Sequence, residues 1–113
     1  MKVIVTGSRD YTNKEFVFEK LDNVNKQYGI DLLICGDASG VDQLAIMWAQ
    51  YNEIPFKKYK ANWGLFGKKA GPIRNEKMAK SGADLCIAFP GGRGTENMKS
   101  NAKKYNIDIL DII

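Results

Sequence analysis

The stretch Ala88-Phe89-Pro90-Gly91-Gly92-Arg93-Gly94-Thr95-Glu96 joins an apolar run, Leu85–Phe89, to a run with helical spacing, Asn97–Tyr105. Three glycines within four residues allow the backbone to turn tightly and to approach a ligand closely. Thr95 is well placed to cap the following helix, where free backbone amides attract anions. A strand, a glycine turn and a helix start are together typical of a site that holds phosphate or a sugar phosphate.

The rest of the chain repeats this alternation of apolar runs and amphipathic segments. Apolar, β-branched runs predict strands, and apolar residues at helical spacing predict helices. The expected strands are Lys2–Thr6, Asp31–Cys35, Phe56–Lys60, Leu85–Phe89 and Ile107–Ile112, and the expected helices cover 14–28, 41–52, 72–81 and 97–105. Thr12 and Glu15 have the form of a capping box for the first helix. Residues 61–71 are expected to form the longest loop.

This order of elements predicts an α/β fold in one domain, residues 1–113. We expect a Rossmann-like three-layer sandwich: a five-stranded parallel sheet of order 3-2-1-4-5 with helices on both faces. The apolar and basic residues of Phe56–Lys60 suit an edge strand. Because parallel strands share one carboxyl edge, the loops after the first four strands gather there. The ligand crevice is expected between strands one and four, flanked by the Gly7 and Gly91 loops.

Composition excludes several classes of protein. No apolar run is long enough to cross a membrane. Cys35 and Cys86 lie in apolar runs, about 9–10 Å apart in the expected sheet, which predicts buried free thiols in a reducing cytoplasm. The chain has no histidine, which removes the usual Ser–His and Cys–His pairs and the commonest metal ligand. No cofactor is expected, and the aspartates have no spacing that demands Mg²⁺.

The net charge of +4 is unevenly distributed along the chain. Residues 57–80 hold eight basic residues against Glu76 alone. A local basic field of this kind suits an anionic partner, and a solvated lysine face is the plainer alternative. Tyr59, Trp63 and Phe66 interleave with these bases, as in single-strand nucleic-acid binders, although core packing explains them equally well.

Candidate ligand-binding residues come from all four loops. Arg9 suits an anion because its guanidinium fork matches phosphate; the alternative is an ion pair with Asp10 or Asp37. Asp42 lies in the first turn of the second helix, either to stabilise the helix dipole or to accept hydrogen bonds from a ribose. Trp63 is interpreted as a base-stacking or core residue. The full candidate set is Gly7, Ser8, Arg9, Gly36, Ala38, Gly40, Asp42, Trp63, Arg74, Asn75, Pro90, Gly91, Gly92, Gly94, Thr95 and Glu96.

Four segments resemble the SLOG superfamily, named for the Smf/DprA and Lonely Guy proteins, and in particular its YspA-like branch. The resemblance covers nearly the whole chain and implies a Rossmann-like sheet with a site for nucleotides or relatives of ADP-ribose. The matching segments are Val5-Thr6-Gly7-Ser8-Arg9, Gly36-Asp37-Ala38-Ser39-Gly40-Val41-Asp42-Gln43-Leu44-Ala45, Asn62–Asn75 and Phe89-Pro90-Gly91-Gly92-Arg93-Gly94-Thr95.

Lonely Guy enzymes cleave the N-glycosidic bond of nucleoside monophosphates, and the resemblance extends to part of their motif. Arg74 matches the arginine of their Arg-x-x-x-Met motif, which makes it a candidate catalytic residue. Their catalytic glutamate follows the threonine of Pro-Gly-Gly-x-Gly-Thr by three residues, where this chain has Met98. Glu96 is the other candidate catalytic residue, two positions short of that place.

Binding is therefore the leading hypothesis. We expect a cytoplasmic protein that binds a nucleotide-derived small molecule for sensing or sequestration. The first alternative is an N-glycosidase acting on nucleoside monophosphates, and the second is a single-stranded nucleic-acid-binding module. No membrane partner is expected. Relatives of this kind often dimerise, and the apolar residues Trp63–Phe66 are candidates for a homodimer contact.

Overall fold

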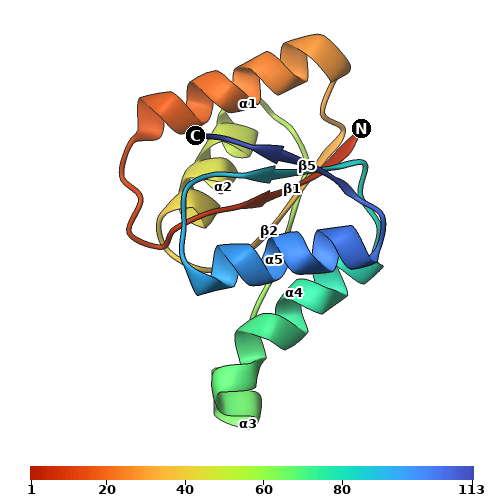
Figure 1. The fold of residues 1–113 in the computed structure, drawn as a ribbon. Coiled ribbons are helices and arrows are strands. Elements are labelled where there is room, and N and C mark those ends of the chain that lie inside the picture. The colour runs from red at the N-terminus through yellow and green to blue at the C-terminus, as the bar shows by residue number, and fades with distance from the viewer.

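A five-stranded parallel sheet organises the structure, a computed structural model that describes all of residues 1–113 (Figure 1). All neighbouring strands pair in parallel, in the order β3-β2-β1-β4-β5. The strands are β1 (Lys2–Thr6), β2 (Leu32–Gly36), β3 (Phe56–Tyr59), β4 (Leu85–Ala88) and β5 (Asp108–Asp111). The expected fold class and strand order are confirmed, and so is the reversal of strand order between β1 and β4.

Helices cover both faces of this sheet. In Figure 1, α1 lies above the strands and α4 and α5 lie below them, while α3 projects beyond α4. Helix α2 packs on the same face of the sheet as α1. The helices are α1 (Lys14–Tyr28), α2 (Val41–Tyr51), α3 (Trp63–Phe66), α4 (Ala70–Lys80) and α5 (Arg93–Lys104), with a 3₁₀ turn at Gly67–Lys69 between α3 and α4.

The central strands divide their side chains between two apolar cores. Val3 and Val5 of β1 contact the core beneath α1 and α2, whereas Ile4 contacts the core beneath α4 and α5. All three residues are fully buried. Successive side chains of a strand point to opposite faces, so the uninterrupted apolar runs of the sequence fit a sheet that is covered on both sides.

Strand β3 occupies an edge of the sheet, as expected, and its lysines are exposed. Cys35 and Cys86 are buried free thiols, and burial in apolar surroundings raises the pKa of both to about 12. Neither thiol therefore ionises at neutral pH. No helix combines the length and the apolar character that crossing a membrane requires.

Two sequence-based expectations about helix starts are wrong. Asn13, not Thr12, caps α1, because its Oδ1 accepts a hydrogen bond from the Phe16 backbone N–H at 3.1 Å. Helix α5 begins at Arg93 rather than Asn97, and its N-cap is Gly92. Thr95 therefore lies within the first turn, where its side chain turns into the protein instead of capping the helix.

The expected loop 61–71 is also a wrong prediction, because most of this segment is helical. Asn62 caps α3 through an Oδ1 that accepts from the Leu65 N–H at 3.0 Å. The 3₁₀ turn then leads directly into α4, which starts two residues before the expected position. The glycines and lysines of this segment predict a loop when neighbouring residues alone are considered. The Asn62 cap and the packing of Trp63 against Gly71 stabilise the helical conformation instead.

Candidate functional site

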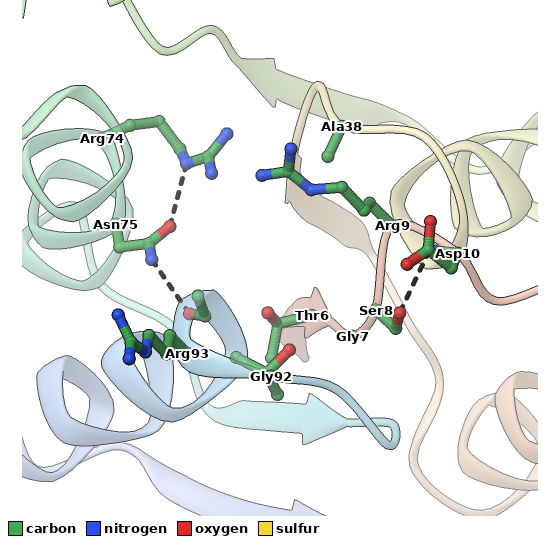
Figure 2. A pocket seen from close by; sticks show the side chains of 12 residues that line it. Thr6, Gly7, Ser8, Arg9, Asp10, Ala38, Arg74, Asn75, Gly92 and Arg93 are labelled. Atoms are coloured by element: carbon green, nitrogen blue, oxygen red, sulfur yellow. Dashed lines mark hydrogen bonds between the residues drawn. The ribbon is translucent and has the colours of Figure 1, made fainter. Parts of the chain in front are cut away.

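A cavity of about 330 Å³ lies at the carboxyl ends of β1 and β4, where the strand order reverses. Figure 2 shows its walls, which come from the loops after β1 and β2, the middle of α4 and the first turn of α5. We call this cavity the site pocket; its lining residues are Thr6, Gly7, Ser8, Arg9, Asp10, Ala38, Arg74, Asn75, Gly92, Arg93, Gly94 and Thr95. The sequence-based placement of the site between these two strands agrees with this geometry.

The first turn of α5 forms one wall of the site pocket. Gly92 provides no side-chain cap, and the first hydrogen bond of the helix runs from Glu96 N to Gly92 O at 3.1 Å. The backbone N–H groups of Arg93, Gly94 and Thr95 have no acceptor within the chain. Three free donors at the positive end of a helix dipole form an arrangement that binds anions.

The hydroxyl of Thr95 adds a fourth donor in the same turn. The residue is 5% exposed, and its Oγ1 is the buried side-chain oxygen or nitrogen that has no hydrogen-bond partner in the structure. Gly91 lies directly over it, so a Cβ at that glycine would collide with the hydroxyl. An orphaned buried hydroxyl is costly, and this one lies in the pocket lining, where a bound ligand can accept its hydrogen.

The loop after β1 forms the opposite wall. Ser8 N donates to Pro90 O at 3.0 Å, which joins this loop to the glycine-rich loop after β4. Ser8 Oγ accepts from Asp10 N at 3.0 Å. Arg9 extends from this loop and has no ion pair, contrary to the alternative of pairing with Asp10 or Asp37. Its guanidinium is therefore free to meet an anion.

Gly40 holds the β1 loop against the start of α2. Its φ of +71° is in the left-handed region, and a Cβ there would collide with the Ser8 carbonyl oxygen. The same carbonyl accepts a hydrogen bond from Val41 N at 3.1 Å. The glycine that sequence reasoning placed in the site thus shapes the wall that carries Arg9, without lining the pocket itself.

Arg74 reaches the pocket from α4 and faces Arg9 across it (Figure 2). Its side chain is 13% exposed, and Nη1 lies 3.4 Å from Asp37 Oδ1. The guanidinium packs on the Cα of Gly36 at the end of β2, where any side chain would displace it. Gly36 therefore acts by leaving room for Arg74 beside the Asp42 carboxylate.

Asn75 ties Arg74 to the first turn of α5. Its Oδ1 accepts from Arg74 Nε at 2.9 Å, while Nδ2 donates to Gly94 O at 3.3 Å and to Asn97 Oδ1 at 3.0 Å. The residue is 4% exposed, so these bonds are made away from water. The Asn75 side chain thus links the partly buried Arg74 guanidinium to the first turn of α5, which carries the free amides.

Asp42 is buried beneath the β2 loop rather than exposed to the site pocket. Its Oδ2 accepts a hydrogen bond from Ala38 N at 3.1 Å. Burial raises the pKa of this carboxyl to about 6, while the Ala38 hydrogen bond and the Arg74 charge pull it down. Its contact with the loop favours a positioning role over direct contact with a ribose.

Trp63 lines a second, smaller cavity of about 190 Å³, which we call the Trp63 pocket. This pocket shares Arg9, Ala38 and Arg74 with the site pocket, so the two are adjoining parts of one groove. Its remaining lining residues are Asp37 and Ser39. Trp63 therefore belongs to the groove and not to the core.

Other candidates lie outside the groove. Glu96 is exposed and pairs with Lys99 at 3.1 Å, and Lys99 also pairs with Asp111 at 3.0 Å. Pro90 and Gly91 support the pocket from behind through the Ser8 and Thr95 contacts described above. Met98 is fully buried in the core beneath α4 and α5.

The candidate set from the sequence lacks five residues that line the two pockets: Thr6, Asp10, Asp37, Ser39 and Arg93. Arg93 lies between two glycines of the glycine-rich loop, and this position in the motif is the sequence feature that indicates it as a lining residue. Asp37 and Ser39 stand inside the second glycine turn, beside residues that were selected. The hydrogen bond from Asn75 to Asn97 had no sequence signal, because it joins two helices.

The fold and the groove together define a Rossmann-like domain with a cationic, glycine-rich pocket at the carboxyl edge of its sheet. The chain belongs to the YspA, cpYpsA-related SLOG family, whose profile matches residues 1–66. It is 36% identical to the Gene 61 protein of Mycobacterium phage D29, over 97% of this chain and 94% of the phage protein.

Among solved structures, the fold is similar to that of DNA processing protein A (DprA) from Streptococcus pneumoniae. The TM-score is 0.81 at 19% sequence identity, and the match covers 99% of this chain. The chain spans 50% of the DprA chain, so the likeness is one of fold with part of a longer protein. The expected membership of the SLOG superfamily, in its YspA-like branch, is confirmed by the family profile.

Proposed function

We propose that this chain binds a nucleotide or a nucleotide-derived small molecule, of the nucleoside monophosphate, ADP-ribose or NAD type, for sensing or sequestration. The observation that carries the proposal is the orphaned Thr95 hydroxyl beside the free amides of α5. Four donors in one helical turn match the acceptor oxygens of a phosphate group. Arg9 and Arg74 add charge-assisted donors from two other elements.

Binding without hydrolysis is favoured over the N-glycosidase alternative. That reaction needs a carboxylate near the anomeric carbon of the sugar. Met98 stands where the Lonely Guy glutamate would stand, and it is buried among apolar side chains. Glu96 points to Lys99 and is not part of the pocket lining. Of the two candidate catalytic residues, Arg74 supplies a cation for the phosphate, but neither supplies a carboxylate at the sugar.

Isothermal titration with AMP, ADP-ribose, NAD and cyclic nucleotides tests the proposal. We expect saturable binding of at least one of them, and Arg9→Ala is expected to weaken it about tenfold or more, as loss of a charge-assisted contact does. Lys26→Ala is the matched control, since it removes an exposed cation from the last turn of α1. Absence of heat with every compound contradicts the proposal.

The same samples separate the alternatives. Chromatography of AMP after incubation with the protein is expected to show no free adenine. Release of adenine that Arg74→Ala abolishes would establish the N-glycosidase. A single-stranded oligonucleotide added to the titration tests the nucleic-acid alternative, which the exposed lysines of residues 57–80 support. Tight, strongly salt-dependent oligonucleotide binding that nucleotides do not displace would favour that alternative.

A further inference from the structure

Beyond phosphate binding, the geometry points to a nucleobase subsite in the Trp63 pocket that selects bases carrying an amino group, such as adenine, over bases that present a carbonyl at the same place. This inference rests on the proposed function, because it assigns the second half of the same groove. It makes Trp63 the stacking surface, and it makes Asp37 and Ser39 the residues that read the edge of the base.

The indole of Trp63 is held in position before any ligand arrives. Its Cη2 atom lies within van der Waals reach of Gly71 in the first turn of α4, at 3.3 Å from the position a Cβ would take. The residue is nevertheless 51% exposed. An aromatic ring that is fixed along one edge and open on the rest of its surface is a ready platform for a flat ring, and base–aromatic stacking is strong.

The two pockets differ in the polar groups that they do not share. Arg9 and Arg74 line both pockets. Beyond these arginines, the site pocket offers the α5 amides and the Thr95 hydroxyl as donors, alongside Asp10. The Trp63 pocket instead adds acceptors, namely the Asp37 carboxylate and the oxygen of Ser39, whose hydrogen is already donated to Arg9 O at 2.9 Å. A phosphate therefore fits best against the first turn of α5, and a base that donates hydrogen bonds fits best beside Asp37 and Ser39.

The acceptors also determine which base fits. An exocyclic amino group donates hydrogen bonds to a carboxylate, whereas a carbonyl oxygen at the same place faces it with no hydrogen to share. Asp37 Oδ1 accepts a long hydrogen bond from Arg74 Nη1, at 3.4 Å. The other carboxylate oxygen, Oδ2, has no hydrogen-bond partner in the chain and can accept from a base. The shared residues Arg9, Ala38 and Arg74 place the sugar between the two pockets.

The test compares ribose 5-phosphate, AMP and IMP by isothermal titration with the full chain. AMP and IMP differ at the amino group, and ribose 5-phosphate lacks the base. We expect AMP to bind about tenfold or more tightly than ribose 5-phosphate, and about fivefold or more tightly than IMP. Trp63→Ala is expected to remove the advantage over ribose 5-phosphate, and Trp63→Phe to keep most of it. Asp37→Asn is expected to make AMP and IMP equal.

Phe66→Ala is the matched control, because Phe66 is an exposed aromatic of the same helix that does not line either pocket. Equal binding of ribose 5-phosphate and AMP, unchanged by Trp63→Ala, overturns the subsite and leaves the phosphate proposal standing. Failure of all three compounds to bind overturns both. A change of oligomeric state on size exclusion with Trp63→Ala, without a change in base preference, identifies Trp63 as a self-association contact instead and also overturns the subsite.

Discussion

At the scale of single residues, the site contains groups whose placement lowers the stability of the free protein. The Thr95 hydroxyl is buried without a partner, and the Asp42 carboxylate is buried beside Arg74. Folding alone favours an apolar group at the first position and an uncharged one at the second. Thr95 lines the site pocket and Asp42 supports the loop that carries Ala38, so a substitution at either residue is expected to raise the stability of the free protein.

Thr95→Val removes the orphaned hydroxyl and keeps the shape of the side chain. We expect the variant to be more stable by about 0.5–2 kcal/mol in urea denaturation, because the cost of burying an unsatisfied hydroxyl disappears. The same variant is expected to bind its nucleotide about tenfold more weakly. Loss of stability, or unchanged affinity, would show that the hydroxyl makes an internal contact and does not serve the ligand. Thr6→Val, at another threonine of the pocket lining, is the comparison.

Asp42→Asn tests the second residue through pH. The native pKa of about 6 lies above the ordinary aspartate value of 3.8, so the folded state holds the proton more tightly. The contribution of Asp42 to stability is therefore greatest below about pH 4, falls as the pH rises through 6, and stays low above that. At pH 7 the variant is expected to be more stable by about 1–3 kcal/mol.

The check is the difference between wild type and Asp42→Asn in the free energy of unfolding, measured at pH 4 and pH 7. Other carboxyl groups contribute equally to both proteins, so they cancel in this difference. Asparagine keeps an oxygen that accepts from Ala38 N, which isolates the charge. A difference that does not change with pH would place the pKa of Asp42 near its ordinary value.

At the scale of elements, the pocket depends on how α4 and α5 are joined. Asn75 hydrogen-bonds Arg74 on its own helix, α4, and also Gly94 and Asn97 on α5. The position of the Arg74 guanidinium therefore depends on where α5 lies. Glycines at the start of α5 make that first turn a weak helix by propensity. The contact from α4 is what holds the turn in the geometry that exposes its amides.

Asn75→Ala removes the side chain that links α4 to the first turn of α5. We expect a loss of about 1–3 kcal/mol in stability from the broken buried hydrogen bonds, together with a loss of nucleotide affinity as Arg74 swings free. Asn101→Ala is the matched control, since Asn101 also bonds Asn97, through O and Oδ1, but does not contact Arg74. If both variants lose affinity equally, general stability and not the Asn75 contact governs binding.

The elements themselves were largely predictable, and their contacts were not. The apolar runs of β1, β2 and β4 predict a parallel sheet with helices on both faces. A strand that is buried on both faces is apolar throughout, whereas a half-exposed strand alternates apolar and polar residues. The start of α5 was misplaced because glycine-rich residues 91–94 carry little helix signal of their own. Residues 61–71 were misjudged for the same reason. The site loops followed from topology, whereas the Asn75 contacts and the orphaned Thr95 hydroxyl depend on which helices meet.

At the scale of the whole molecule, positive charge is concentrated in residues 57–80, part of which adjoins the groove. Residues 57–80 hold eight of the 17 basic residues and only one of the 13 acidic residues. They include the end of β3, α3, the 3₁₀ turn and α4, which adjoin Trp63 and Arg74. A field of this kind raises the rate at which an anionic ligand arrives, and salt screens it.

A charge-matched pair of variants tests this steering. Lys60, Lys68 and Lys69 lie in or next to the segment between β3 and α4, and changing all three to glutamine lowers the charge near the groove. The control changes Lys2, Lys26 and Lys103, which lie at the start of β1 and in the last turns of α1 and α5, toward the other edge of the sheet. Both variants lose the same net charge, so only its position differs.

We expect the first variant to slow nucleotide association several-fold at about 20 mM salt and to leave dissociation nearly unchanged, since rim charges act mainly on the encounter. The control is expected to associate at close to the wild-type rate. Near 300 mM salt the Debye length is a few ångström, and the wild type and both variants should converge. Stopped-flow tryptophan fluorescence on mixing with nucleotide follows both rates, because Trp63 is exposed beside the groove whereas Trp48 is fully buried. An equal effect of the two variants would mean that net charge, and not its placement beside the groove, controls arrival of the ligand.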